Sequence, residues 1–434
     1  MKNKFIKSTI ILIIGGFITK VLGMIIKIVL TRLIGAKGIG LYSMIMPTFL
    51  LLNSIAQLGL PTALNILIAN NKYNTKNLII SAISISLTID LLILIFLLLF
   101  SNNISTNLLN NPKLSHSILS IGFVLPFITI SNCLRSYFFA KQRMYPHVIT
   151  NIIEDLVKLV FIIIGIPIFL KKGIEFAVTF VILSNIFCEL SSIIIFIFLL
   201  PSFKCNKKDL KYNKENIKNL FGVALPTTGS RLIGSIGYFL EPIIITYVLT
   251  NIGYSNDYIL KEYGIINGYV MQLVLLPSFF TGAISQALIP IVSKNFSLGN
   301  FRYINKKIKQ AILICLLIGI PSTFIFIFFP DILLKLLFNT NHGINYIKII
   351  APICLLHYIQ SPISSSLQAM GSSKISMKGT FLGMILRTIS LFIFSYFKIG
   401  LYSLIIATSI NITFVTIFDY YNIKKILNKH LRKA

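Results

Sequence analysis

Two lysines lie inside a strongly apolar stretch of the chain, Gly15–Tyr42, which reads "GGFITKVLGMIIKIVLTRLIGAKGIGLY". Lys20 and Lys27 are seven residues apart, so on a helix they share one face about 10 Å apart along the axis. Three small residues extend that face: Gly16, Gly23 and Thr31. Because a charge that faces lipid is costly, this stripe favours a water-filled cavity that holds an anion. The alternative, a side chain that extends to the membrane surface, stays open for Lys27.

A second set of ionisable residues lies in His147–Gly165, "HVITNIIEDLVKLVFIIIG". Asn151, Glu154 and Lys158 follow helical spacing on one face, and Glu154 precedes Lys158 by four residues, the favourable orientation for an ion pair. Two interpretations stay open. The pair makes insertion of the helix possible, or it lines a cavity and orients a substrate or carries a coupling ion.

A third cation, Arg231, lies in the stretch Pro226–Pro242, "PTTGSRLIGSIGYFLEP". A guanidinium group is suited to bidentate contact with phosphate. We expect Arg231 to meet the lysines of the first span across a central cleft. Glu241 lies off the face of Arg231, directly ahead of Pro242, and is a candidate for ion coupling.

Other polar residues interrupt apolar stretches without forming a recognisable catalytic motif. We retain Asn53, Gln57 and Gln272 as cavity candidates, although such residues more often form hydrogen bonds between helices. Gln272, Phe279 and Gln286 recur every seven residues. The sequence contains no P-loop, HExxH or GxSxG motif, and its five cysteines are scattered. We therefore expect neither an enzyme nor a metal site.

The elements that position these residues are membrane helices. The chain is 55% hydrophobic and only 12% charged, with a mean hydropathy of +0.84, and apolar runs of about 20 residues or more recur along it. This pattern predicts an all-α integral membrane protein with about twelve transmembrane helices. The expected spans are 9–33, 40–69, 77–100, 116–139, 147–170, 174–200, 217–250, 263–291, 308–330, 344–369, 376–397 and 399–422.

The net charge of +28 follows the positive-inside pattern. If both termini are cytoplasmic, the inner segments hold 25 of the 40 lysines and arginines and the outer segments hold nine. This bias predicts an N-in, C-in topology. It also accounts for most of the positive charge, so a nucleic-acid partner is not expected.

The polar stretch Cys205–Asn219 divides the expected spans into two sets of six. We predict an N-terminal lobe over 1–203, a basic cytoplasmic linker over 204–219 and a C-terminal lobe over 220–434. A parallel 6+6 repeat is indicated by "KVLG" at Lys20–Gly23 and "RLIG" at Arg231–Gly234. A gapless alignment of spans 5 and 11 also places Lys158 on Arg387.

Three stretches resemble a known family of membrane proteins: Leu22–Leu64, Tyr145–Leu159 and Arg231–Ile245. They resemble the polysaccharide-biosynthesis membrane proteins and, more narrowly, the stage V sporulation protein B family. This family belongs to the MOP (MATE-like) superfamily, which includes the MurJ-type lipid II flippases. The resemblance implies two six-helix lobes around a central cavity, which alternate between inward-open and outward-open states.

The resemblance also implies a cargo, a polyprenyl-pyrophosphate-linked oligosaccharide, and a site in which cations meet the pyrophosphate. Lys20, Lys27, Lys158 and Arg231 are the residues expected in that site. MurJ-type proteins carry further arginines on spans 2 and 8, where this chain has only amides. We therefore expect a peptidoglycan precursor or a related wall or spore-cortex precursor, without assigning lipid II itself.

Two other functions are retained. One is a cation-coupled multidrug exporter of the same superfamily, which would need acids in the cleft, and the other is a non-transporting scaffold in envelope or spore assembly. We expect a monomer in the cytoplasmic membrane with no cofactor, and the coupling ion, Na⁺ or H⁺, is left open.

Overall fold

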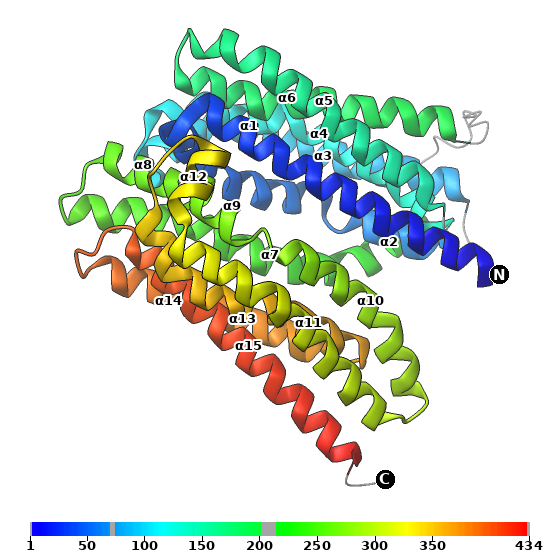
Figure 1. Cartoon of the computed structure of the whole chain (residues 1–434). Helices are drawn as coiled ribbons and strands as arrows, with labels where there is room; N and C mark the ends of the chain where they lie inside the picture. Colours follow the sequence, from blue (N-terminus) through cyan, green and yellow to red (C-terminus); the bar gives the residue numbers. More distant parts are fainter. Residues whose placement is uncertain (1, 70–73, 142, 201–213, 432–434) are drawn as a thin grey trace. The chain divides into compact units, whose positions relative to one another are not determined.

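The computed structural model describes residues 2–69, 74–141, 143–200 and 214–431, and every regular element in these ranges is a helix. The chain divides into two compact units, Met1–Pro242 and Ile243–Ala434, and the boundary lies within α7 (Figure 1). The expected division at 204–219 stays a prediction, since residues 201–213 lie outside the described ranges.

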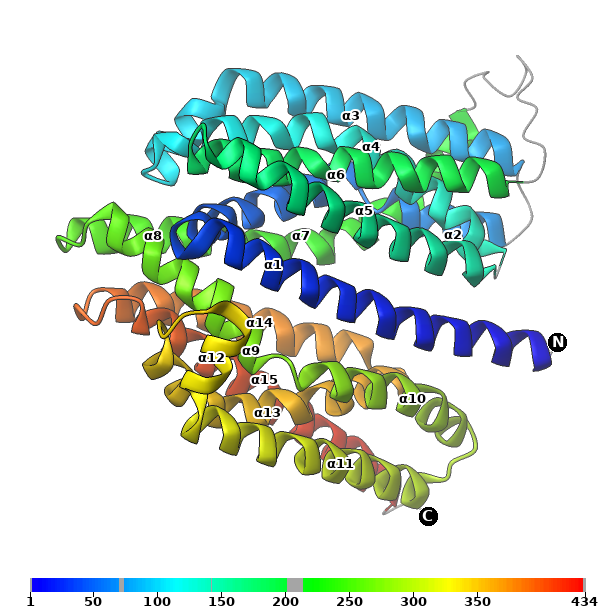
Figure 2. The same ribbon diagram turned by 45° about the horizontal axis from the view of Figure 1, so that its top comes forward.

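The first unit is a helical bundle. In it α3, α4, α5 and α6 run side by side, and α1 packs against α5 (Figure 2). Its elements are α1 (Lys2–Gln57), α2 (Leu60–Ala69), α3 (Thr75–Asn103), the short η1 (Ile104–Leu108) and η2 (Pro112–Leu114), α4 (Ser115–Ala140), α5 (Met144–Leu170), α6 (Ile174–Leu199) and the larger part of α7 (Lys214–Asn251).

Two breaks at glycines shape the first two expected spans. Gly35 has φ +65° and ψ −176°, so it interrupts the helical path of α1 between the spans expected at 9–33 and 40–69. The second expected span is itself broken where Leu58 and Gly59 both have positive φ, and α2 begins immediately afterwards. Glycine adopts this conformation without the steric cost of a Cβ atom.

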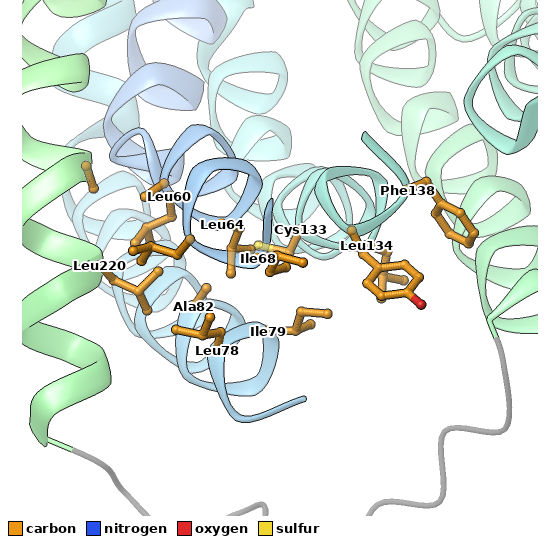
Figure 3. Packing of buried hydrophobic residues seen from close by; sticks show 14 of the residues in the cluster. Leu60, Leu64, Ile68, Leu78, Ile79, Ala82, Cys133, Leu134, Phe138 and Leu220 are labelled. Carbon is orange, nitrogen blue, oxygen red and sulfur yellow. The ribbon is translucent and has the colours of Figure 1, made fainter. Parts of the chain in front are cut away.

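An apolar cluster joins α2, α3 and α4 at the end of the bundle where α2 lies. Leu64 and Ile68 of α2 and Leu78 of α3 are buried there, and the Cys133 thiol of α4 lies among them (Figure 3). Such burial is the main favourable contribution that side chains make to helix packing. Cys133 is therefore a packing residue, as its apolar surroundings in the sequence predict.

The second unit is also a bundle, in which α13 contacts α10, α11 and α15, and α14 packs on α15. Its elements are α8 (Asn256–Ile265), the π-helical η3 (Ile266–Val270), α9 (Met271–Val274), α10 (Ser278–Ser297), α11 (Phe301–Phe328), α12 (Pro330–Phe338), α13 (Ile344–Ala369), α14 (Ser373–Ser395) and α15 (Tyr402–Leu431).

The span expected at 263–291 is not one straight helix. The segments Asn256–Val274 and Ser278–Ser297 meet at an angle of 54°, and Pro277, which cannot donate a backbone hydrogen bond, precedes the second segment. The π-helical turn η3 adds a second irregularity. Gln272 of α9 and Gln286 of α10 therefore lie on opposite sides of the bend.

Seven helices in the described ranges are long and apolar enough to cross a membrane, or eight if the bent pair forms one span. The protein is a multi-pass, all-helical membrane protein. The remaining expected spans coincide with α1, α5 and α7, so twelve spans with both ends inside stays a prediction.

Adjacent glycines at the start of the first span provide a test of the packing of α1 on α5. A Cβ atom on Gly15 would lie 2.2 Å from Cγ1 of Val148, whereas one on Gly16 would meet nothing within 4 Å. We expect Gly15→Ala to destabilise the protein by about 1–3 kcal/mol through overpacking. The matched Gly16→Ala variant should be neutral or slightly stabilising, as measured by thermal unfolding in detergent.

Candidate functional site

A buried ion pair connects α4 and α5 in the first unit. Nη2 of Arg135 lies 2.6 Å from Oε1 of Glu154, and the side chains are only 19% and 17% exposed. The hydroxyl of Ser192 on α6 donates to the same carboxylate oxygen. One acid thus holds together three helices that pack against each other. The short, charge-assisted contact in such an environment is stronger than a surface ion pair.

The expected partner of Glu154, Lys158, is engaged by another helix instead. Its ammonium group donates to Oδ1 of Asn185 on α6 over 3.0 Å. The amide nitrogen of Asn185 donates to the carbonyls of Val181 and Ile182, which leaves its oxygen for the lysine. Tertiary packing therefore places Arg135 of α4 on Glu154 and separates the pair that the sequence spacing predicts.

Two further acids lie near this pair. Glu189 of α6 lies in the fields of Glu154, Arg135 and Lys158, and Asp155 lies in those of Glu154 and Lys158. We call the following residues the ionic cluster: Arg135, Glu154, Asp155, Lys158, Asn185, Glu189 and Ser192. Its three carboxyl groups face two cations, and Lys27 of α1 lies close enough to Lys158 for the two charges to repel each other.

The helix α1 presents a different surface. Lys20 and Lys27 are exposed, and a Cβ atom on Gly16 or Gly23 would meet nothing within 4 Å. That these two lysines line a cavity for an anion stays a prediction. Thr31 does not belong to this exposed surface, because its side chain is 2% exposed and its hydroxyl donates to the carbonyl of Lys27.

Four other candidates are Asn53, Gln57, Glu241 and Gln272. Asn53 and Gln57 pair with each other, since Nε2 of Gln57 donates to Oδ1 of Asn53 over 2.8 Å. This bond lies within α1 and does not join two helices. Glu241 is buried in α7, and Gln272 belongs to α9 in the second unit.

The last two candidates, Asn151 and Arg231, belong to α5 and α7. Asn151 is half-buried in α5, one turn from Glu154 and Asp155. Arg231 belongs to the helix α7, but its side chain lies outside the described residues. Gly234, three residues after Arg231, resembles Gly23 in that a Cβ atom there would meet nothing within 4 Å.

Comparison with known proteins identifies the family. The family model described as "Polysaccharide biosynthesis protein" matches residues 5–296, and the stage V sporulation protein B of Bacillus subtilis is 32% identical over 98% of this chain and 85% of its own length. The chain belongs to the polysaccharide biosynthesis protein family. A second model, MatE, matches residues 266–393 of this family member.

Other relatives of this polysaccharide biosynthesis protein are more distant. The lipid II flippase MurJ of Bacillus subtilis is 22% identical over 90% of the chain and 77% of that protein. An inward-facing multidrug-resistance MATE transporter of the MOP superfamily superposes with a TM-score of 0.77 at 14% identity, with 96% of each chain covered. This likeness shows that the family member has a MATE-like fold.

Sequence reasoning missed five of the seven members of the ionic cluster in this family member. The predicted site residues did not include Arg135, Asp155, Asn185, Glu189 and Ser192, which lie on α4, α5 and α6. The available signal was their position within apolar runs, where an arginine or glutamate requires a partner. Which helix would supply that partner depends on packing between α4, α5 and α6, which periodicity does not reveal.

A double-mutant cycle tests which cation pairs with Glu154. We expect Arg135→Gln and Glu154→Gln each to destabilise the protein, by up to about 3–5 kcal/mol, because each leaves a buried charge without its partner. The double variant should recover part of this loss, measured by thermal unfolding.

The matched cycle uses Lys158→Gln with Glu154→Gln. There we expect nearly additive effects, since Lys158 bonds to Asn185 instead. A larger coupling energy for Lys158 than for Arg135 would contradict the observed pairing.

Proposed function

We propose that this protein is a flippase for a polyprenyl-pyrophosphate-linked oligosaccharide, which it moves from the inner to the outer leaflet by alternating access. A peptidoglycan precursor, lipid II or a related wall or spore-cortex precursor, is the proposed cargo. The protein would act as a carrier and not as an enzyme.

One observation supports this proposal: in the first unit the acid Glu154 is largely buried and bonded, whereas the lysines of α1 are exposed. Glu154 is bonded to Arg135 and Ser192 and is largely buried, whereas Lys20 and Lys27 are exposed beside glycines that leave open space. An exporter of cationic drugs needs accessible acids. The exposed lysines of α1 suit an anionic cargo instead.

The physics of the transfer agrees with a cationic face of this kind. A pyrophosphate must cross about 30 Å of hydrocarbon, and nearby ammonium groups lower the electrostatic barrier to that movement. The lipid tail stays in the bilayer throughout. We propose that Lys20, Lys27, Lys158 and Arg231 contact the pyrophosphate during the cycle, and that Lys158 does so only when its bond to Asn185 opens.

A vesicle assay tests the function. The purified protein is reconstituted with a labelled pyrophosphoryl-linked lipid oligosaccharide, and arrival of the label at the opposite leaflet is followed over time. We expect protein-dependent transfer. In the Lys20→Gln, Lys27→Gln double variant its rate should fall by tenfold or more, since an increase of about 1.4 kcal/mol in the activation free energy slows transfer tenfold.

The matched control is Lys171→Gln with Lys172→Gln, an exposed lysine pair after α5. This variant removes the same charge and should transfer cargo at the parental rate. Absence of any protein-dependent transfer would contradict the flippase. Efflux of cationic drugs that survives loss of Lys20 and Lys27 would favour the multidrug exporter, and a requirement for the protein in wall assembly without either transport would favour the scaffold.

The proposal includes an N-in, C-in topology in the cytoplasmic membrane, based on the positions of the lysines and arginines. Labelling of single introduced cysteines in intact cells tests it. Cysteines placed at Lys171 or His342 should react with an impermeant maleimide, and one placed at Lys306 should react only after permeabilisation. The reverse pattern would contradict the topology.

A further inference from the structure

An acid outside the ionic cluster lies at the middle of a membrane helix. Asp90 belongs to α3, within the apolar segment Thr75–Leu108, and has no exposed surface. The next two residues, Leu91 and Leu92, are 57% and 62% exposed. The carboxyl group therefore points away from the lipid-facing side of α3, toward the packed interior of the first unit.

The hydroxyl of Thr129 faces two oxygen atoms, one of which belongs to Asp90. Oγ1 of Thr129 on α4 lies 2.7 Å from Oδ2 of Asp90 and 3.0 Å from the carbonyl oxygen of Pro126. The threonine hydroxyl has one hydrogen and cannot fully satisfy two acceptors. Both contacts become ordinary hydrogen bonds if Asp90 carries a proton, because the carboxyl then donates to Thr129 and Thr129 donates to Pro126.

Among the described residues, no cation is found in contact with Asp90. Its described hydrogen-bond partner is Thr129, and the titratable group of α4 that its field reaches is the Cys133 thiol. The helix α2 and the turn η1 carry no ionisable side chain, and Asp90 forms no ion pair with α1 in the described part of the chain. A carboxylate here would be an uncompensated charge in a low-dielectric interior, which costs several kcal/mol.

Two buried oxygen atoms beside the contact of Asp90 with Thr129 have no hydrogen-bond partner among the described residues. They are Oδ1 of Asp90 and Oγ of Ser86. Ser86 precedes Asp90 by one helical turn, on the same side of α3. The two helices approach closely beside them, since a Cβ atom on Gly122 would lie 3.2 Å from Cα of Leu94.

We propose that Asp90 is a proton-binding site of this protein, separate from the ionic cluster, and that its bound proton bridges α3 to α4 through Thr129. When the proton leaves for water, the threonine hydroxyl turns from the carbonyl of Pro126 to the carboxylate, so the bond between the two helices reverses its donor and the Pro126 carbonyl loses that hydrogen bond. This inference rests on the first unit alone and does not depend on the proposed cargo.

Infrared spectroscopy of the purified protein in lipid tests the site. At neutral pH we expect a carbonyl band of a protonated carboxyl group, sensitive to deuterium exchange, that is lost in Asp90→Asn. Thr129→Val should keep this band and shift its frequency, because the carboxyl loses its acceptor. The matched control, Asp331→Asn, removes an exposed acid in the first turn of α12 and should leave the band unchanged.

Two results would overturn the proposal. The first is an Asp90→Asn spectrum that lacks a carboxylate band present in the parent at neutral pH. The second is loss of the protonated band when NaCl replaces KCl at constant pH, which would assign the site to sodium. Should Asp90→Asn fail to fold, an unshifted band in Thr129→Val overturns the proposal as well.

Discussion

A charge inside a bilayer requires an opposite charge, a hydrogen-bonding partner or water, and the arrangement of the first unit follows from this constraint. Arg135, Glu154 and Ser192 come from three different helices and meet at one carboxylate oxygen. Their contact fixes the relative positions of α4, α5 and α6. The lysines of α1 are exposed instead, although Lys27 still lies close enough to Lys158 for their charges to repel each other.

The helical architecture could be predicted from the sequence because apolar runs of span length and flanking lysines are local signals. The bends and breaks within the spans were harder to predict from the sequence. Pro277 was visible as a proline, yet many prolines in membrane helices leave the helix straight enough to continue, as Pro290 does within α10. The 54° bend follows from the combination of Pro277 with the turns around it, which depends on packing in the second unit.

The site was predictable only in part, for a related reason. Spacing places Glu154 and Lys158 on one helical face, but a rule based on spacing considers only partners on the same helix. Arg135 competes for Glu154 from α4, and its planar, multiply donating group is the better partner for a carboxylate. In the second unit a buried acid is held in a different way, since the hydroxyl of Ser364 donates to Asp419 of α15.

The ionic cluster has a consequence for how the chain enters the membrane during synthesis. The helices α3, α4 and α6 are each apolar enough to cross a bilayer alone, whereas α5 is absent from that group and carries Glu154, Asp155 and Lys158. The partners of these charges are synthesised just before α5, as Arg135, and just after it, as Asn185 and Ser192. We therefore expect α5 to insert stably into the lipid only together with α4 and α6, which carry the partners of its charges. Substitutions at Arg135 would then appear first as reduced insertion and yield, before any effect on transport could be observed.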